Sequence, residues 1–453
     1  MDLPEAFLER MQGQLGTDYD AFVSSYLENS SYGLRINLLK GAVDEIIPAL
    51  PFTLHQIPWV AEGFYADSAE HPGRHPLHEA GVYYIQEPSA MSVVSLLDPV
   101  PGENICDLCA APGGKSSQIA GHMQGNGLLV SNEIIPNRAK ILSQNIERMG
   151  ISNALVCTET PERMASHFPL FFDKVLVDAP CSGEGMFRKD DIAISEWSPE
   201  QVEICRERQE MILDCADAML KSGGVLIYST CTFAPEENEE QIEHFLQNHQ
   251  EYVIEPWQNY LPADCGIAEG SLPGSMRLFP HKLKGEGHFA VRLRKKGTSM
   301  SSNKREAKEK SRKKIPVELS EFWDFNEKVI SNCPFTTTEH YEFFGDELYR
   351  IPAEIPSIQG IKTERPGLHL GTRKKNRFEP SLAWARTLKP DQAPSYNCTK
   401  EEALRYLHGE ALSADDALNG WILICHKNFP LGWAKATRGM LKNHYPKGLR
   451  IKY

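Results

Sequence analysis

A regular alternation of strand-like and helix-like segments between residues 86 and 256 narrows this chain to very few folds. Short apolar segments, among them "NICDLCA", "GLLVSNEI", "NALVCT", "DKVLVDAP" and "GVLIYST", are separated by longer amphipathic ones such as "PNRAKILSQNIERMG". Strands and helices that alternate at this spacing form a parallel sheet with helices on both faces. The sequence therefore predicts a doubly wound α/β core over residues 86–297, with "HFAVRLRK" as an added edge strand.

The segments on either side of this core predict further domains. Residues 1–85 combine helical patterns with "GLRINLLK", whose apolar residues alternate with polar ones as in a half-buried strand, so we expect a small α+β domain. Residues 298–315 are charged and lack periodicity, which predicts a basic linker. Beyond it we expect an intermediate domain over 316–388 and a terminal domain over 389–453, the latter rich in strands, aromatic residues and basic residues.

The distribution of charge limits how this chain could bind nucleic acid. Its net charge of -13 excludes a protein that coats nucleic acid by charge alone. Basic residues are nevertheless concentrated at the end of the chain, where residues 427–453 hold seven Lys and Arg and no acidic residue. Taken alone, such a run is typical of a solvated basic tail.

Cysteine content and hydropathy bear on the location of the protein. The eleven cysteines are scattered along the chain, and the N-terminal sequence has no secretory signal. No segment approaches the roughly 18 apolar residues that a membrane span requires. We therefore expect free thiols, a cytoplasmic location, no association with membranes and a monomeric protein.

The first predicted strand of the core leads into a glycine turn, "DLCAAPGGKSS". Gly113 and Gly114 permit close approach of the backbone to a ligand, and the start of the following helix favours a carboxylate or a phosphate. Glu133 ends the next strand, twenty residues after Gly113, where it can accept hydrogen bonds from ribose hydroxyls. Because ligands of open α/β sheets bind at the carboxyl ends of the strands, this pattern predicts a cofactor that contains a nucleoside.

The same turn distinguishes between possible cofactors. It lacks the G-x-G-x-x-G of dinucleotide-binding proteins. A phosphate-binding P-loop is the closer rival, but Cys109 stands where its first glycine should be, and Pro112 removes an N–H from the loop. S-adenosylmethionine needs only a site for its carboxylate and its ribose, so we prefer it. Cys106 and Cys109 form a C-x-x-C without a second pair, which favours packing over metal binding.

Two cysteines follow neighbouring strands, Cys181 after "VLVDAP" and Cys231 after "VLIYST". Carbon 5 of a pyrimidine is too weak a nucleophile to accept a methyl group unaided, but a thiolate that adds to carbon 6 activates it. The carbon-5 proton must then be lost and the thiol eliminated, so a second acid–base group is useful. Asp178 could bond to N3 of the base and stabilise the addition. The pattern favours methylation of a pyrimidine at carbon 5.

Three motifs resemble, in order, the signatures of the Nop/Sun family of RNA 5-methylcytosine methyltransferases: "DLCAAPGGKSSQIA", "VLVDAPCSGEGMFRKD" and "YSTCTFAPEENE". "LRINLLK" and "YYIQEPSAM" resemble the segments that precede them, so the resemblance covers residues 30 to 295 or so. The C-terminal "PLGWAKATRGMLKNHYPKGLR" is similar to the PUA-like module of the bacterial F-type enzymes of this family. Those enzymes modify small-subunit (16S) ribosomal RNA near the decoding centre.

The resemblance implies roles for the residues at the strand ends. Cys231 would be the nucleophile, Cys181 would assist release of the product, and Asp178 would lie between cofactor and base. The residues implied to bind the cofactor are Cys109, Ala110, Ala111, Pro112, Gly113, Gly114 and Lys115 at the methionine end, Glu133 at the ribose, Thr160 near the adenine, and Asp178. Thr160 departs from the family, which commonly has an acidic residue there; Glu159 lies beside it.

These observations predict a Rossmann-like class I enzyme that uses S-adenosylmethionine to methylate carbon 5 of cytosine in RNA, with 16S ribosomal RNA as the expected partner and no metal. A small N-terminal domain and a C-terminal PUA-like region would bind the RNA. Two alternatives stay open, a P-loop-like NTPase and a non-catalytic RNA-binding protein on a methyltransferase fold. We also expect the C-terminal module to supply affinity and not chemistry, so that a chain ending near residue 315 still binds the cofactor.

Overall fold

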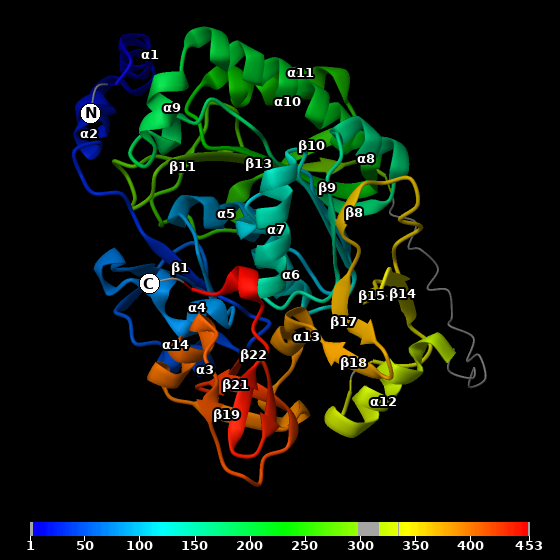
Figure 1. The fold of residues 1–453 in the computed structure, drawn as a ribbon. Coiled ribbons are helices and arrows are strands. Elements are labelled where there is room, and N and C mark those ends of the chain that lie inside the picture. The colour runs from blue at the N-terminus through cyan, green and yellow to red at the C-terminus, as the bar shows by residue number, and fades with distance from the viewer. Residues whose placement is uncertain (1–2, 298–316, 334, 452–453) are drawn as a thin grey trace.

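The computed structural model describes residues 3–297, 317–333 and 335–451, and the predicted basic linker at 298–315 lies outside these residues. Its centre is a ten-stranded sheet in the order β11-β12-β13-β9-β8-β5-β6-β7-β16, with β10 paired to β13 (Figure 1). The strands are β5 (Asn104–Asp107), β6 (Leu128–Asn132), β7 (Ala154–Cys157), β8 (Phe172–Asp178), β9 (Leu220–Thr230), β10 (Tyr252–Glu255), β11 (Ala268–Glu269), β12 (Met276–Leu278), β13 (His288–Lys295) and β16 (Thr363–Arg365).

The predicted parallel sheet is confirmed. β7, β6, β5, β8 and β9 are consecutive in the sheet, and every pair of neighbours among them is parallel. "HFAVRLRK" forms β13, which pairs antiparallel with β9 as an added strand. It is not at the edge, however, because β10 and β12 pair with its far side.

Helices cover both faces of the sheet, as Figure 1 shows, so the core is doubly wound. They are α5 (Pro88–Leu97), α6 (Gly114–Met123) and α7 (Pro136–Arg148) on one face and α8 (Pro161–His167), α10 (Pro199–Met219) and α11 (Glu239–Asn248) on the other. Successive strand residues enter opposite layers: Ile105 packs with the first set of helices and Cys106 with the second. Within the described residues, no helix is long and apolar enough to cross a membrane.

The N-terminal domain contains a four-stranded sheet in the order β2-β3-β1-β4. Its elements are α1 (Glu5–Leu15), α2 (Tyr19–Ser25), β1 (Gly33–Ile36), α3 (Val43–Ile46), β2 (Leu54–Gln56), β3 (Gly63–Ala66), α4 (Pro76–Glu79) and β4 (Tyr83–Ile85). The expectation that β1 is half-buried is wrong, because all four of its residues are buried. Arg35 lies under α6, where its guanidinium donates to the Gly114 carbonyl at 3.0 Å and to Ser117 Oγ at 2.7 Å.

Two further sheets follow the core, in the orders β14-β15-β17-β18 and β19-β21-β22-β23-β20. Their elements are α12 (Ser320–Val329), β14 (His340–Phe344), β15 (Glu347–Ile351), β17 (Leu368–Lys374), β18 (Arg377–Pro380), α13 (Leu382–Thr387), β19 (Ser395–Cys398), α14 (Lys400–His408), β20 (Leu412–Ser413), β21 (Gly420–His426), β22 (Phe429–Thr437) and β23 (Met440–Asn443). The intervening β16 leaves both sheets and pairs antiparallel with β7. The C-terminal half therefore extends the core sheet, which the sequence did not predict.

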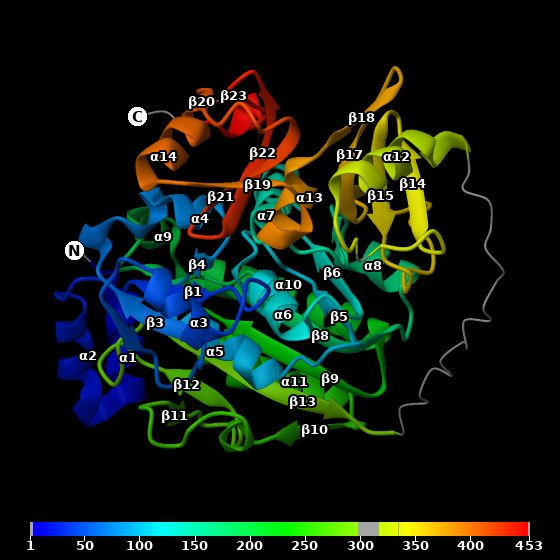
Figure 2. The same ribbon diagram turned by 90° about the horizontal axis from the view of Figure 1, so that it is seen from below.

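The N-terminal and terminal domains share one hydrophobic core, and Figure 2 shows β21 and α14 beside α4. Leu34 and Ile36 belong to the same buried cluster as Tyr406, Ile424 and Leu431. The Lys40 ammonium also donates to the backbone carbonyl of Arg386. This contact argues against the expectation that a chain ending near residue 315 retains its cofactor site, because such a chain would expose the shared core.

Candidate active site

The predicted site residues converge at the carboxyl edge of the parallel strands. A cavity of about 660 Å³ opens there between the turns after β5, β6, β8 and β9. Cys109, Glu133, Asp178, Cys181 and Cys231 all line it, although they come from four different turns. Strands that run parallel deliver their turns to one edge of the sheet, which is why residues more than a hundred positions apart meet.

The two cysteines lie side by side. Their sulfur atoms are 3.3 Å apart, within hydrogen-bond distance, and both side chains are half-buried. The hydrogen bond with Cys231, together with burial, raises the pKa of Cys181 well above its ordinary value. Cys181 therefore keeps its proton at neutral pH and can share it with the neighbouring sulfur.

Asp178 is a fixed carboxylate on the same wall of the cavity. It accepts from the Lys115 ammonium at 2.6 Å and from Ser229 Oγ at 2.9 Å, and His288 Nε2 lies 3.6 Å away. Burial alone would raise the pKa of Asp178, but Lys115 and His288 outweigh it and hold the pKa well below its ordinary value. The carboxylate therefore stays ionised and can accept a hydrogen bond from a substrate.

Lys115 gains from this pair as well. Burial lowers the pKa of its ammonium, but the neighbouring Asp178 outweighs that effect and raises the pKa above its usual range. Gly113 is the N-cap of α6 and has a φ of 110°, a left-handed conformation that favours glycine, and a Cβ there would lie 3.1 Å from Leu142 Cδ1. The turn that leads into α6 and Lys115 is thus shaped by glycine, as the sequence predicted.

Asp107, the last residue of β5, is a candidate site residue that was not predicted from the sequence. It lies at 0% exposure and lines a second cavity of about 270 Å³ with Pro112, Gly114 and Lys115. One carboxyl oxygen accepts from Ser116 Oγ at 2.7 Å, and the other has no hydrogen-bond partner within the described chain. Burial raises the pKa of Asp107 to about 7. Its position directly before the glycine turn is the signal that could have revealed it.

The carboxylates of Glu133 and Glu159 differ in how far the chain itself occupies them. Glu133 lines the larger cavity while accepting from the backbone N–H of Ile135 at 2.9 Å and lying 3.3 Å from Arg138. Glu159 is engaged by Arg163 Nε at 2.7 Å and by the backbone N–H of Lys362 at 2.6 Å. Its carboxylate is therefore occupied by the chain itself.

Thr160 is the N-cap of α8, and its hydroxyl accepts from the backbone N–H of Arg163 at 3.4 Å. Its neighbour Pro161, and not Thr160, is among the described residues that line the cavity. The capping bond is local and accounts for a threonine at this position. A contact between Thr160 and the adenine stays a prediction.

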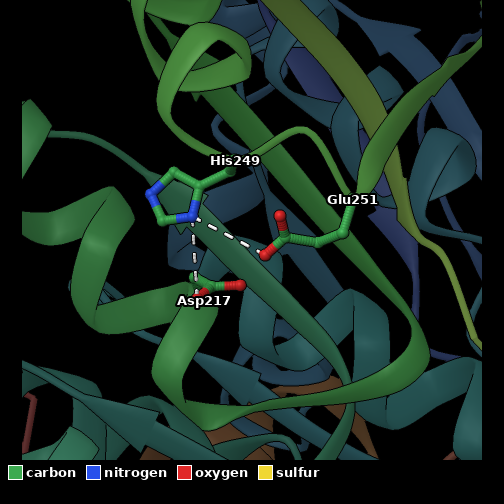
Figure 3. Close-up of side chains that lie close together, drawn as sticks. All are labelled: Asp217, His249 and Glu251. Atoms are coloured by element: carbon green, nitrogen blue, oxygen red, sulfur yellow. Dashed lines mark ion pairs between the residues drawn. The ribbon is translucent and has the colours of Figure 1, made fainter.

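Asp217, His249 and Glu251 form the one group within the described residues whose ligand atoms are close enough to hold a metal ion. Figure 3 shows both carboxylates facing the same nitrogen of the His249 ring, and each lies 3.8 Å from this Nδ1. Lys295 Nζ already donates to Asp217 at 2.6 Å. Asp217 lies near the end of α10, just before β9 begins, whereas His249 and Glu251 lie between α11 and β10. Because a lysine cation already pairs with one of the three residues, at the end of β9 opposite the candidate active site, we assign no metal to the group.

Comparison with known proteins links this geometry to a family. Family models match four consecutive parts of the chain: "N-terminal domain of 16S rRNA methyltransferase RsmF" at residues 3–88, "16S rRNA methyltransferase RsmB/F" at 94–294, "RsmF rRNA methyltransferase first C-terminal domain" at 324–388 and "Methyltransferase RsmF PUA domain" at 393–451. The ribosomal RNA small subunit methyltransferase F of Vibrio vulnificus (strain YJ016) is 31% identical over 99% of this chain and 97% of its own length. That of Erwinia tasmaniensis is 32% identical over 98% and 96%.

The chain belongs to the ribosomal RNA small subunit methyltransferase F family. The resemblance to Nop/Sun methyltransferases is thereby confirmed.

Two solved structures are similar to this chain over about two thirds of its length. The protein PH0851 has a TM-score of 0.58 and 29% identity over 65% of this chain and 66% of its own. A methyltransferase homolog protein from Pyrococcus horikoshii has a TM-score of 0.55 and 27% identity over 64% and 95%. The Rossmann-like methyltransferase core, the N-terminal domain and the C-terminal PUA domain expected from the sequence are all confirmed.

Proposed function

We propose that this protein uses S-adenosylmethionine to methylate carbon 5 of a cytosine in 16S ribosomal RNA, near the decoding centre, through a covalent bond between Cys231 and the base. Its family relatives are named as small-subunit ribosomal RNA methyltransferases, which supports the RNA substrate. The observation that carries the carbon-5 chemistry is the pair of thiols 3.3 Å apart beside a carboxylate. Methylation at a ring nitrogen or an exocyclic group would need neither thiol.

The residues of the two cavities fit S-adenosylmethionine. The unpartnered oxygen of Asp107 is a buried acceptor that suits the ammonium of the methionine end. The start of α6 suits its carboxylate, and Glu133 suits the ribose hydroxyls. When bound, the cofactor would supply an electrophilic methyl group. A P-loop NTPase is disfavoured, because Asp107 would face a phosphate with a carboxyl group.

The chain's own residues would activate and release the base. Cys231 would bond to carbon 6 of the cytosine as its thiol proton is lost, and N3 would take up that proton as the ring loses its aromatic character. The ionised Asp178 accepts a hydrogen bond from that N3–H and so stabilises the adduct. Once carbon 5 carries the methyl group, its proton must pass to a base, the bond from sulfur to carbon 6 breaks, and N3 gives up its proton to solvent. Cys181 lies 3.3 Å from the departing sulfur, so its thiol can give that sulfur a proton while the Cys181 thiolate takes the proton from carbon 5.

The terminal domain offers a face that suits RNA. Trp421, Lys435 and Lys442 lie opposite one another on β21, β22 and β23, so that their side chains form one row across the sheet. Lys435 Nζ is 5.8 Å from the Trp421 ring, and neither lysine forms an ion pair within the described residues. An aromatic ring beside two unpaired cations can stack on a base and bind phosphates.

Two cysteine variants test the covalent mechanism. Cys231→Ala should form neither adduct nor product, because the attacking sulfur is gone. Cys181→Ala should still attack and methylate, but it should remain attached to its RNA and give a slow-migrating band on a denaturing gel. That band should be absent from the double variant. A band from Cys231→Ala that vanishes in Cys181→Ala would reverse the two roles.

Two other results would reject the proposal outright. If neither variant ever gives an adduct, the covalent mechanism fails. If the native protein transfers no methyl group to ribosomal RNA, a non-catalytic RNA-binding protein becomes the better interpretation.

A further inference from the structure

A buried network lies directly behind the two thiols, and the chemistry proposed above does not use it. Its centre is Glu237, at 0% exposure in the turn between β9 and α11. The Glu237 carboxyl group accepts from the backbone N–H of Ser182 at 3.0 Å and also bonds to the Ser182 hydroxyl. Ser182 directly follows Cys181, so this carboxyl group binds the turn that carries the second thiol.

The same carboxyl group is tied to that turn a second time through α10. Gln209 is fully buried in α10 and donates to Glu237 Oε2 at 2.7 Å and to the backbone carbonyl of Pro180 at 3.0 Å. Pro180 directly precedes Cys181. Glu237 therefore holds Cys181 from both sides, through Ser182 after it and through Gln209 and Pro180 before it.

The network continues to the nucleophile. Ser182 Oγ lies 2.8 Å from Thr232 Oγ1, and Thr232 directly follows Cys231. Asn238, next to Glu237, donates to the Thr232 carbonyl at 3.0 Å and accepts from Thr230 Oγ1 at 2.6 Å. The residues on either side of Cys231 are thus bound to Asn238, whose neighbour Glu237 binds Ser182 beside Cys181.

We infer that Glu237 is a positioning residue: through Ser182 and Thr232 it fixes the two thiol-bearing turns relative to each other, and so sets the distance on which release of the methylated RNA depends. The inference rests on the function proposed above and adds a residue to it. Glu237 touches neither thiol, and it acts only through the residues beside them. Burial raises the pKa of Glu237 to about 7, which is consistent with a carboxyl group that forms its hydrogen bonds within the chain and not with solvent.

The inference makes a specific prediction about which step fails. If Glu237 is removed, Cys231 can still attack, because the base and Asp178 are unaffected. Release of the RNA needs both sulfur atoms at the right distance from each other, so release should slow more than attack does. Glu237→Ala should therefore accumulate the covalent RNA adduct, as Cys181→Ala does, whereas a merely destabilised protein should lose attack and release together.

The distance between the two thiols can be tested without the cofactor. A short bifunctional alkylating reagent should join Cys181 to Cys231 in the native protein, and peptide mass spectrometry quantifies the joined fraction. In Glu237→Ala we expect that fraction to fall severalfold. Glu237→Gln keeps one oxygen for the Ser182 N–H and should give an intermediate value. Ser182→Ala removes a single hydroxyl group and provides a second test if Glu237→Ala does not fold.

Glu239→Ala is the matched control. Glu239 is also buried, two positions along the chain, but its carboxylate pairs with Arg277 and not with either thiol turn. At a comparable loss of thermal stability, Glu239→Ala should show native cross-linking and no adduct. Native cross-linking and no adduct in Glu237→Ala and Ser182→Ala would overturn the inference. If neither Cys181→Ala nor Cys231→Ala gives an adduct, the proposed covalent mechanism fails, and the cross-linking still decides the role of Glu237.

Discussion

The candidate active site and the interface between the N-terminal and terminal domains both join segments that are far apart in the sequence, but they are built differently. The active site gathers short turns that a parallel sheet delivers to one edge, so each turn needs only its own strand to be positioned. The interface joins buried apolar residues from two domains, such as Ile36 and Ile424, whose sequences carry no mark of their partner. Local chemistry can therefore be inferred from a sequence more readily than long-range packing.

Removing the interface should have the largest effect. A chain that ends at residue 297 lacks the terminal domain and also β16, which pairs with β7 in the core sheet. It would expose the buried side chains of β1 to water, at a cost of roughly 1.5–3 kcal/mol for each large apolar residue. We expect no cooperative thermal transition by calorimetry and no binding of S-adenosylmethionine.

The truncated chain decides whether the two regions are independent. Full-length affinity for the cofactor together with a cooperative transition would show that the core folds alone and that the interface is dispensable. A full-length chain with substitutions only on the exposed row of the terminal domain is the control, because it should retain both properties.

The contrast explains which parts of the structure the sequence could predict. The parallel order of the core, the glycine at φ 110° and the meeting of Cys181 with Cys231 follow from short apolar strands that alternate with amphipathic helices, and from the turns after those strands. The burial of Arg35 and the edge strand β16 do not, because both depend on a partner more than fifty residues away. A buried arginine in a short strand has the same sequence pattern as an exposed one.

Two glutamates that follow neighbouring strands, Glu133 and Glu159, test which carboxylate belongs to the proposed cofactor site. Glu133→Ala should weaken binding of S-adenosylmethionine by roughly ten- to a hundredfold, since a charge-assisted hydrogen bond contributes about 1.5–3 kcal/mol. Glu159→Ala should leave that affinity nearly unchanged, because Arg163 and Lys362 occupy its carboxylate. Titration calorimetry measures both. Equal affinities for the two variants would remove Glu133 from the cofactor site.

A pH-dependent prediction concerns the interface. Glu79 lies 3.8 Å from Arg386 and accepts from Tyr445 Oη at 3.2 Å. Burial raises the pKa of Glu79, but His78 and Arg386 outweigh it and lower the pKa to about 2. Because the folded pKa is below the unfolded one, the contribution is present above about pH 4.5 and is lost as the pH falls toward 2. Glu79→Gln removes a charged hydrogen-bond acceptor and should cost roughly 1.5–3 kcal/mol at pH 7.

Urea unfolding at pH 7, 5 and 4 tests the sign of this effect. The difference in the free energy of unfolding between the unsubstituted protein and Glu79→Gln should narrow as the pH falls. The reason is that Glu79 takes up a proton in the unfolded chain at a higher pH than in the folded protein. A difference that stays constant over this range would show that Glu79 acts by packing and not by its charge.

The smallest effect should come from single lysines on the terminal domain, which lie outside both regions. Lys442 is exposed and lies opposite Lys435 in the row with Trp421, so Lys442→Gln should remove one phosphate contact. RNA affinity should fall about two- to fivefold, and the slope of log K against log salt should decrease by roughly 0.7, the value for one contact to a single strand. Lys400→Gln is the matched control, because Lys400 is equally exposed but begins α14 away from the row. If both variants lose affinity with the same change in slope, the loss reflects net charge alone, and the row is not the RNA-binding face.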